Sequence, residues 1–427
     1  MNRNQFQNEP VQTQARGPVR ISLGVLIICI LLTGAFVFTG TFVGFSSYYR
    51  NYQKTRYPEF DKLTEIAEIY DKVYLKDLDK DYLNQLLIWS YLYGTGDQYS
   101  YYYTAEEWAM EEAAAAGASV GIGVYIKPNE SQELRIVKVM QDAPAFAAGL
   151  QPNDVIVAID GNNVKEIGYT EATKMLSGEI GEEITLDILR GEQIFTVTLQ
   201  YEHYVWQTVF PELLLKDGKK IGYIQIASFM SIETTGYQFK AAVETLMENG
   251  AEGLVFDLRD NGGGDISTVV YMLDYLLPEG PIVHVEFPKF NESETYYSDA
   301  SEIDIPMTVL VNGSSASASE LFTAALRDYQ KAEIIGLRTY GKGCGQLGQS
   351  LSDGSVIFIT SFLYTPPFSE NYEGIGIYPD HEVALDEKWN GTSVYLVPHD
   401  EDAQLKKAAS VLKDLISEKA NSDQSQT

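Results

Sequence analysis

Val309-Leu-Val-Asn-Gly-Ser-Ser-Ala-Ser-Ala-Ser-Glu320 joins an apolar run to a serine-rich turn, and Thr339-Tyr-Gly-Lys-Gly-Cys-Gly-Gln346 follows it after a helix-forming run. The apolar residues from Met307 to Val311 predict a strand, and the serine-rich turn behind them opens a predicted helix from Ser317 to Tyr329. Such a strand-to-helix junction presents helix N–H groups that stabilise negative charge. The stretch therefore predicts an α/β layer with a place for a nucleophile at the junction.

The same alternation of strands and helices extends to both sides of this stretch and indicates an α/β domain. The other predicted strands are Ile221 to Ile226, Gly253 to Leu258, Ile334 to Gly336 and Ser355 to Thr360. The other predicted helices are Gln238 to Asn249, Ile266 to Leu277 and a final amphipathic helix, Glu401 to Ile416.

Several serines crowd the central turn, and the residue types alone do not choose among them: Ser314, Ser315, Ser317 and Ser319. Serines at such a place often do no more than cap a helix. Ser317 has the position that suits a nucleophile, because it lies where the helix begins. A nucleophilic serine also needs a base, and a desolvated lysine is one of the known bases.

Lys342 is the candidate base, because a glycine on each side lets the backbone pack tightly around it. Burial disfavours the ammonium form and lowers the pKa of a lysine. A neutral Lys342 could then accept the proton of Ser317 and later return it to a leaving amine. The alternative is a solvated lysine in an ordinary glycine turn.

Short β-rich runs occupy Ser119 to Gln200, and one helical stretch, Tyr169 to Leu176, lies among them. With Gly121-Ile-Gly-Val124 and Gly149-Leu-Gln-Pro-Asn-Asp-Val155, this pattern resembles a PDZ domain. PDZ domains bind extended C-termini by strand addition and capture the terminal carboxylate with backbone N–H groups. Taken alone, Gly-Ile-Gly-Val is an ordinary turn into a strand. The predicted strands are Gly123 to Ile126, Leu134 to Val139, Asp154 to Ile159, Ile184 to Leu189 and Ile194 to Leu199.

The N-terminal part contains an apolar run without a charge, Ile21 to Phe45, followed by predicted helices between Phe60 and Leu92. A run of about 20 or more apolar residues is long enough to cross a bilayer as a helix. Arg16 and Arg20 precede it, which favours a cytoplasmic N-terminus. A cleaved signal peptide is the alternative, but its apolar region would be shorter, about 7–15 residues.

The composition excludes some classes of protein. The formal net charge is −29, with 60 acidic against 31 basic residues, which argues against nucleic-acid binding. The two cysteines, Cys29 and Cys344, lie in the apolar segment and beside Lys342, so a disulfide framework is not expected. The four histidines lack a motif context, so a Ser-His-Asp site is the less favoured alternative: His203, His284, His381 and His399.

Taken together, these motifs resemble the carboxyl-terminal processing peptidases, serine proteases with a Ser-Lys pair and an inserted PDZ domain. The likeness covers about residues 55–415. The resemblance implies a ClpP/crotonase-like α/β core in which Ser317 is the nucleophile, Lys342 the base and Gln346 the residue that orients the lysine. It implies no metal or cofactor. Glu373-Gly-Ile-Gly-Ile-Tyr-Pro-Asp380 also resembles a family motif, and its expected role is structural.

The resemblance also assigns binding groups. The N–H of Ala318, just after the nucleophile, is one oxyanion-hole candidate, and Gly263 in Leu258-Arg-Asp-Asn-Gly-Gly-Gly264 is the other, with Gly262 next to it. Gly121, Ile122, Gly123 and Val124 are the candidates for binding a substrate carboxylate. The chain departs from the family pattern at several positions: Gln98, Asp260, Gly262, Cys344 and Gly345.

The sequence thus predicts a membrane-anchored serine endopeptidase that cleaves proteins near their C-termini, with its catalytic part outside the cytoplasm. Its partners would be substrates with accessible C-termini and the membrane, without nucleic acid; a homodimer is one of the states that the resemblance allows. An inactive PDZ adaptor of the same fold and another α/β serine hydrolase remain alternatives. The predicted parts are a cytoplasmic tail 1–20, an anchor 21–45, a helical region 49–116, a PDZ domain 117–202, a peptidase core 203–418 and a disordered tail 419–427.

Overall fold

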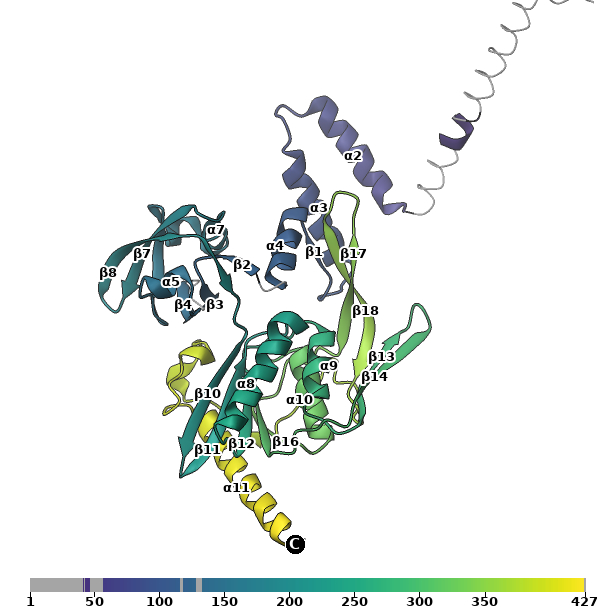
Figure 1. The fold of residues 1–427 in the computed structure, drawn as a ribbon. Coiled ribbons are helices and arrows are strands. Elements are labelled where there is room, and N and C mark those ends of the chain that lie inside the picture. The colour runs from purple at the N-terminus through teal and green to yellow at the C-terminus, as the bar shows by residue number, and fades with distance from the viewer. Residues whose placement is uncertain (1–40, 42, 47–56, 116–117, 128–132, 426–427) are drawn as a thin grey trace, which may run out of the picture. The chain divides into compact units, whose positions relative to one another are not determined.

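The computed structural model describes residues 41, 43–46, 57–115, 118–127 and 133–425 (Figure 1). The chain forms two compact units, Met1–Leu86 and Leu87–Thr427. In the first unit, helix α2 (Glu59–Val73) has acidic residues in its first turn and Lys72 in its last, which suits the helix dipole. Its apolar residues recur at helical spacing, as predicted, yet Leu63 and Ile69 are exposed. Helix α3 (Lys80–Gly94) follows and crosses into the second unit.

The predicted membrane anchor, 21–45, lies almost entirely outside the described residues. Within the ranges that the structure describes, no helix is both long and apolar enough to cross a bilayer. The anchor and the tail 1–20 therefore stay predictions.

The centre of the second unit is a sheet of mostly parallel strands, which confirms the predicted α/β class. Its strands follow the order β10, β11, β12, β15, β16, β19, and all neighbours are parallel except β10 and β11. The four strands predicted for this sheet, β11, β12, β15 and β16, reappear within two residues of their predicted ends, whereas β10 and β19 were not predicted. The bounds of the six strands, in sheet order, are Val209–Lys216, Lys219–Ile226, Gly253–Asp257, Met307–Val311, Ala332–Gly336 and His381–Glu382.

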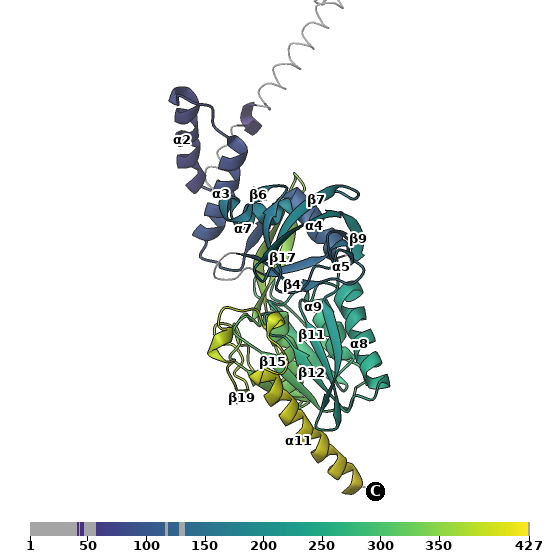
Figure 2. The ribbon, with the colours of Figure 1, turned by 90° about the vertical axis from the view of Figure 1, so that its left-hand side faces the viewer.

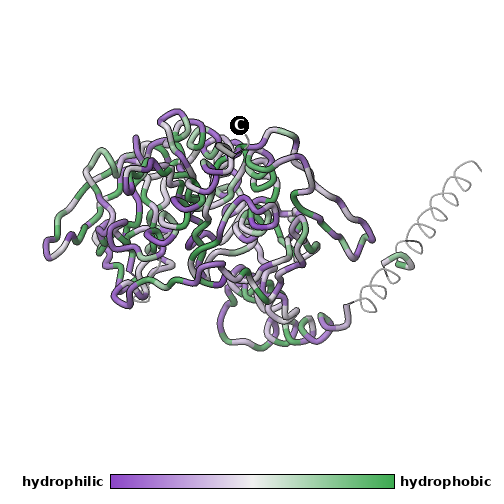
Figure 3. Tube along the Cα trace, turned by 90° about the horizontal axis from the view of Figure 1, so that it is seen from below, coloured by the Kyte–Doolittle hydropathy of each residue, from purple (hydrophilic) through white to green (hydrophobic). Residues whose placement is uncertain are grey.

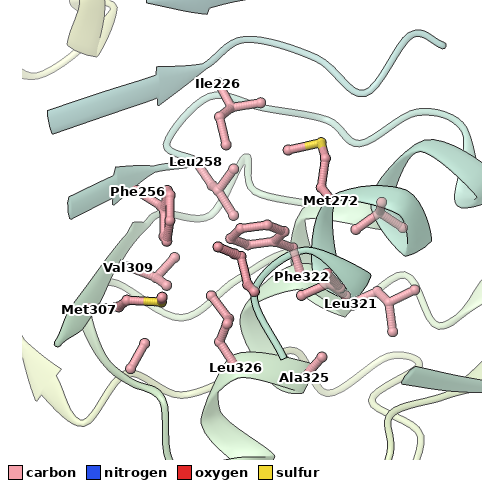
Figure 4. Packing of buried hydrophobic residues seen from close by; sticks show 14 of the residues in the cluster. Ile226, Phe256, Leu258, Met272, Met307, Val309, Leu321, Phe322, Ala325 and Leu326 are labelled. Atoms are coloured by element: carbon pink, nitrogen blue, oxygen red, sulfur yellow. The ribbon is translucent and has the colours of Figure 1, made fainter. Parts of the chain in front are cut away.

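Helices cover both faces of this sheet (Figure 2). On one face, Phe322 packs among Phe256, Leu258 and Met272, and the rings of Phe256 and Phe322 are 5.3 Å apart (Figure 4). Fully burying one such side chain contributes about 1.5–3 kcal/mol. The helices on this face are α8 (Tyr237–Glu248), which follows a π-helical turn Ile232–Gly236, α9 (Ile266–Asp274) and α10 (Ala318–Asp328).

Helix α11 (Ala403–Ser425) covers the opposite face, where Leu405 and Leu412 pack against Tyr223 and Val255. The helix extends well beyond its predicted end at Ile416. It includes most of the tail 419–427 that was predicted to be disordered, so that prediction is corrected up to Ser425. Two short 3₁₀ turns precede α11, Glu387–Trp389 and Val394–Leu396.

A second sheet stands beside the first, and most of it was not predicted (Figure 1). In β17 the sequence Cys-Gly-Gln-Leu-Gly-Gln-Ser has little β propensity, and its strand conformation follows from pairing with β18 along its whole length. The strands are β1 (Tyr101–Tyr103), β13 (Gly280–Phe287), β14 (Glu292–Ser298), β17 (Cys344–Ser350) and β18 (Val356–Thr365).

The region predicted to resemble a PDZ domain is a small antiparallel sheet with its own core, which includes Leu134, Ile136, Ile156 and Leu186. The sheet follows the order β3, β4, β5, β7, β8, so β3 is an edge strand in the described chain. The strands are β3 (Val124–Lys127), β4 (Leu134–Val139), β5 (Val155–Ile159), β6 (Asn162–Asn163), β7 (Glu183–Arg190) and β8 (Gln193–Gln200). The helices are α5 (Pro144–Ala147), α6 (Val164–Ile167) and α7 (Tyr169–Met175).

A separate two-stranded sheet is formed by the segments that enter and leave this small domain. β2 (Ala118–Gly121) pairs antiparallel with β9 (Glu202–Val205), and α4 (Ala105–Ala115) precedes β2. Along the whole second unit, hydrophilic residues gather at the tips of outlying loops and hydrophobic stretches lie inside (Figure 3).

Candidate active site

Ser317 stands at the junction between the buried strand β15 and helix α10, as predicted. Its backbone has φ +57° and ψ −118°, a conformation that is costly for a residue other than glycine and that is often found at active sites. In this backbone conformation the side chain lies at the N-terminus of α10, where helix N–H groups favour negative charge.

The surroundings of the four serines separate their roles. Ser315 Oγ donates to the carbonyl of Leu258 at 2.7 Å, and Ser319 Oγ donates to the carbonyl of Asn261 at 2.9 Å. Both hydroxyls are buried and hold the neighbouring loop in place, while Ser314 is exposed. Of the four, Ser317 is the one that lines the cavity that also contains Lys342.

Lys342 and Gln346 meet as the resemblance implies, with Lys342 Nζ donating to Gln346 Oε1 at 2.9 Å. Burial is the main cause that lowers the pKa of Lys342, while nearby groups, first Cys344 and Glu373, act in the opposite direction. In the described chain, no hydrogen bond joins Lys342 Nζ to Ser317 Oγ. Catalytic hydrogen bonds in ligand-free structures often form fully only when substrate binds.

The glycines beside Lys342 are needed for close approach, as predicted. A Cβ on Gly341 would lie 2.8 Å from the nitrogen of Gly376, and Gly341 has φ +93°. A Cβ on Gly343 would lie 2.5 Å from the side-chain oxygen of Asn371. The segment Glu373–Asp380, expected to be structural, therefore packs directly against the lysine turn.

Glu320 ties the nucleophile segment to the base segment, a role that the sequence reasoning missed. Its carboxylate is fully buried and accepts the N–H groups of Ser317 at 2.9 Å, Gly341 at 2.7 Å and Lys342 at 2.8 Å. The Thr339 hydroxyl donates to it at 2.5 Å. Burial raises the pKa of Glu320, and these hydrogen bonds oppose the rise. The spacing Ser-x-x-Glu, a capping box, was the available signal.

Tyr364 contacts both segments through one hydroxyl, which lies 2.5 Å from the Lys342 carbonyl oxygen and 3.2 Å from Ser317 Oγ. A carbonyl can only accept, so the phenolic proton lies on the shorter contact. The remaining lone pair of Tyr364 then faces Ser317 Oγ. Burial raises the pKa of Tyr364 far above its usual value, so this hydroxyl stays protonated.

The glycine-rich loop after β12 is held by a buried ionic network around Arg259. Arg259 donates to both carboxylate oxygens of Asp257, at 2.9 and 2.6 Å, and its guanidinium lies 2.8 Å from Asp402. Gln404 accepts from it at 2.8 Å, and Tyr223 donates to Asp257 at 2.7 Å. Because Asp402 and Gln404 lie at the start of α11, the network fixes the loop to the sheet and to that helix.

Gly263 lies against the nucleophile, because a Cβ on it would come within 2.8 Å of Ser317 Cβ and 2.9 Å of the Ala318 nitrogen. Its own N–H, however, donates to the side chain of Asn261 at 2.9 Å. Gly263 can donate to the oxyanion only if its N–H gives up the hydrogen bond to Asn261. Gly262 and Ala318 line the cavity directly. The oxyanion assignment to Ala318 and Gly263 therefore stays a prediction.

The cavity around Ser317 and Lys342 has a volume of about 510 Å³. Apolar and aromatic walls surround a few polar groups, which is typical of a site for an organic ligand. No histidine lies among the described residues that line it. The walls include Met230, Ile266, Leu321, Tyr101, Tyr103, Trp108, Phe358 and Phe362.

Two departures from the family pattern have local explanations. A Cβ on Gly345 would lie 2.1 Å from the ring of Phe362, so this ring occupies the space that any side chain at position 345 would need. Cys344 is buried, and burial, with Glu373 adding to it, raises the pKa of its thiol to about 12. The thiol stays protonated and is not a competing nucleophile.

The candidate carboxylate-binding loop of the small domain has the expected backbone. Gly123 has φ +76°, and a Cβ there would lie 2.1 Å from that of Ala143, so the position requires glycine. The carbonyls of Ile122 and Gly123 accept from Ala145 and Met140 at 2.9 and 2.8 Å. Among the described residues, no hydrogen bond uses the N–H of Ile122 or of Gly123.

Comparison with known proteins identifies the family of this chain. The model of peptidase family S41 matches residues 220–383, and that of a PDZ domain matches residues 120–200. A "Probable CtpA-like serine protease" of Staphylococcus saprophyticus is 30% identical over 362 residues, which covers 84% of this chain and 72% of that protein. The chain belongs to peptidase family S41. It is a serine peptidase of that family with a PDZ domain, as the sequence predicted.

Other S41 relatives agree with this assignment. The protein of the same name in Staphylococcus aureus strain COL is 31% identical over 361 residues and covers 84% of this chain and 71% of that protein. A solved structure from Bacteroides fragilis, whose name assigns it to the S41 proteases, has a TM-score of 0.51 at 17% identity. It covers 70% of this chain and 83% of that chain, and it supports the fold alone.

Proposed function

We propose that this S41 peptidase is a membrane-anchored endopeptidase that cleaves protein substrates near their C-termini with Ser317, Lys342 and Gln346, and that its PDZ domain recognises substrates or gates the site. The main support is the cavity that Ser317 and Lys342 line together, with the Lys342 amine held by Gln346 at 2.9 Å. Mass spectrometry of membrane and secreted proteins, with wild-type chain and with Ser317→Ala, tests it by naming the tails that are cleaved.

The mechanism follows from these groups. Ser317 Oγ attacks the scissile carbonyl carbon while neutral Lys342 accepts the hydroxyl proton, and Gln346 orients the amine. The negative charge on the former carbonyl oxygen lies at the N-terminus of α10. The C–N bond then breaks, the leaving amine takes the proton from Lys342, and water hydrolyses the ester on Ser317.

The PDZ part of the proposal rests on the edge strand β3 and the unused N–H groups of Ile122 and Gly123. A substrate C-terminus would extend the sheet beside β3, and these N–H groups would bind its carboxylate. We expect a peptide with a C-terminal amide to bind about 10- to 100-fold more weakly than the free acid, because charge-assisted hydrogen bonds are lost. Fluorescence polarisation with the Ser317→Ala chain measures this without cleavage. Equal affinity for both peptides would contradict the assignment of this loop.

Gating is supported by contacts that join the ligand strand of the PDZ domain to the peptidase part. Tyr125 in β3 packs edge-on against Tyr395, with ring centroids 5.7 Å apart. Lys138, its neighbour in β4, lies 3.7 Å from the ring centre of Phe210. A peptide added to β3 would therefore bind beside this junction. It would open or close the active site only if it binds one of these two states better than the other.

Deleting residues 119–200 separates the roles of the PDZ domain. Lower activity on tailed proteins is expected if the domain delivers or activates, and higher activity on unstructured peptides is expected if it inhibits. Tyr395→Ala tests the junction itself, with Lys165→Ala on the exposed helix α6 as the matched control. Unchanged cleavage rates and unchanged cleavage sites after the deletion would rule out both recognition and gating.

Membrane anchoring is supported by the charge-free apolar run 21–45 alone. We expect the mature protein to keep this run and to sediment with membranes, with the catalytic part outside the cytoplasm. N-terminal sequencing checks the prediction, and a mature chain that begins near Ser46 would show cleavage instead.

Two alternatives from other classes make different predictions. An inactive PDZ adaptor would lose no function in Ser317→Ala, whereas the peptidase loses its activity. Another α/β serine hydrolase would turn over small esters but show no preference for peptides with free C-termini.

A further inference from the structure

The turn Asp97–Ser100, between α3 and β1, reaches the lysine site from a part of the chain far away in sequence. The Asp97 carboxylate accepts the N–H of Tyr99 at 2.9 Å and the hydroxyls of Ser100 at 2.5 Å and Thr360 at 3.1 Å. The Thr360 N–H in β18 donates back to Ser100 Oγ at 3.2 Å. The turn is thus bound to the strand that lies beside Gln346.

A directed chain of hydrogen bonds runs from the lysine to Asp97. Lys342 Nζ donates to Gln346 Oε1 at 2.9 Å, Gln346 Nε2 donates to Thr360 Oγ1 at 3.5 Å, and Thr360 Oγ1 donates to Asp97. Because Asp97 takes the hydroxyl proton of Thr360, this oxygen can offer only lone pairs to Gln346. Gln346 must then present its NH₂ to Thr360 and its oxygen to Lys342, which is the orientation that holds the amine.

Tyr99 completes the surroundings of the amine from the same turn. Its ring centre lies 5.2 Å from Lys342 Nζ, within the range of a cation–π contact, which favours the ammonium that forms on proton transfer. Its hydroxyl donates to Glu373 at 3.0 Å, and Glu373 accepts the N–H of Gly343 at 2.6 Å. Tyr99 therefore contacts the amine and also holds the turn that carries it.

The segment after this turn belongs to the same site. β1 pairs with β18, and Tyr101 stacks on Phe358 with ring centroids 4.9 Å apart. Tyr101, Tyr103 and Trp108 line the catalytic cavity. This pairing fixes Asp97 and Tyr99 relative to Thr360.

We propose that Asp97 is a positioning residue for the base: through Thr360 it sets the orientation of the Gln346 amide, and thereby the position of Lys342, while Tyr99 covers the amine. The inference rests on the proposed Ser317–Lys342 mechanism and gives a role to Asp97 and Tyr99, which precede the peptidase core in the sequence. A simpler alternative is that Asp97 only stabilises its own turn.

Removing the Thr360 hydroxyl separates the two alternatives, and the charge of Asp97 adds a second observable, the pH dependence of activity. Burial acts to raise the pKa of Asp97, but hydrogen bonds from Ser100, Tyr99 and Thr360 outweigh it, so the pKa is lowered and Asp97 is anionic. Its charge raises the pKa of Lys342 against the effect of burial. Without that charge, Lys342 becomes neutral at lower pH. The ionisable groups around Lys342 are Tyr99 and Asp97 from the turn, Cys344 from β17, Tyr364 from β18, Glu320 from α10 and Glu373.

The test measures kcat and KM against pH for the full-length chain with a fluorogenic peptide. For Asp97→Asn, which keeps the shape, we expect the acid limb to move toward lower pH by about half a unit. For Thr360→Val, which lacks only the hydroxyl, we expect kcat to fall about 10-fold with KM little changed. Thr360→Ser should restore wild-type activity, and Glu106→Gln, an exposed carboxylate in α4, is the matched control.

An acid limb that does not move in Asp97→Asn, together with wild-type kcat in Thr360→Val, would overturn the inference. Thermal unfolding of each variant separates loss of function from loss of fold, and the Ser and Val variants at 360 differ in the hydroxyl that carries the argument. If Ser317→Ala or Lys342→Ala remains active, the proposed mechanism fails instead. The experiments therefore distinguish a failure of the Asp97 positioning role from a failure of the Ser317–Lys342 mechanism.

Discussion

Replacing Ser317 or Lys342 by alanine is expected to abolish proteolysis while the chain stays folded. In the proposed mechanism Ser317 supplies the attacking oxygen and Lys342 the base, and removal of such a group typically lowers kcat by about 10⁴-fold or more. Both side chains line the cavity, and the core residues behind them are untouched. Cleavage of a fluorogenic peptide by purified variants, with circular dichroism as the check on folding, measures the effect.

The neighbouring serine provides the control for this prediction. Ser314 is exposed, and Ser314→Ala should keep wild-type activity. Gln346→Ala should lose less than either catalytic variant, because Gln346 orients the amine and does not react. Wild-type turnover by purified Ser317→Ala or Lys342→Ala would contradict the mechanism.

The pH dependence follows from the state that the base must have. Burial lowers the pKa of Lys342 below 10.5, and only the neutral amine can accept a proton. Activity should therefore rise with pH through this lowered pKa, earlier than for an ordinary lysine. Lys342→Arg should be inactive at every pH, because a guanidinium is not deprotonated in proteins.

Replacing Arg259 by methionine is expected to cause the largest loss of stability among single changes in the glycine loop. The substitution leaves Asp257 and Asp402 buried without their cation, and breaking a buried ion pair in this way costs about 3–5 kcal/mol. All three side chains are at most 1% exposed. Urea unfolding measures the change, and activity should fall with it because the loop loses its attachment to α11.

The control is an ion pair at the surface. Lys413 and Asp217 are 2.8 Å apart and partly or fully exposed, so Lys413→Met should leave the urea midpoint almost unchanged. A midpoint for Arg259→Met that equals that of Lys413→Met would show that the network contributes little to stability.

Periodicity and turn chemistry predicted most of the fold. The strand Met307–Val311 and the helix after Ser317 were found because a mostly apolar run ends in a serine-rich turn. The strands of the PDZ domain were found because alternation is clear on a half-buried sheet. By contrast, β17 was missed, since Cys-Gly-Gln-Leu-Gly-Gln-Ser is a strand only through its pairing with β18. The end of α11 was missed because polar residues after Ile416 suggested disorder.

The sequence named the candidate reacting groups, but it did not indicate the side chains that hold them in place. Ser317 lies in one short motif, and Lys342 and Gln346 lie in a second that follows it after a single helix. Glu320 and Tyr364 act through contacts that sequence spacing does not show, because they depend on how β18 and the glycine turns fold back. Asp97 is even more distant in the sequence from Lys342, and it reaches Thr360 only because β1 pairs with β18.

Covalent labelling can identify Ser317 as the nucleophile and Lys342 as its base in one experiment. The full-length chain is treated with a serine-directed fluorophosphonate over a range of pH, and peptide mass spectrometry locates the adduct. We predict one adduct, on Ser317, forming at a rate that rises with pH as the activity does and that falls about 10³-fold in Lys342→Ala. An adduct on another residue would rule out Ser317 as the nucleophile, and a labelling rate at Ser317 that does not depend on Lys342 would rule out Lys342 as its base.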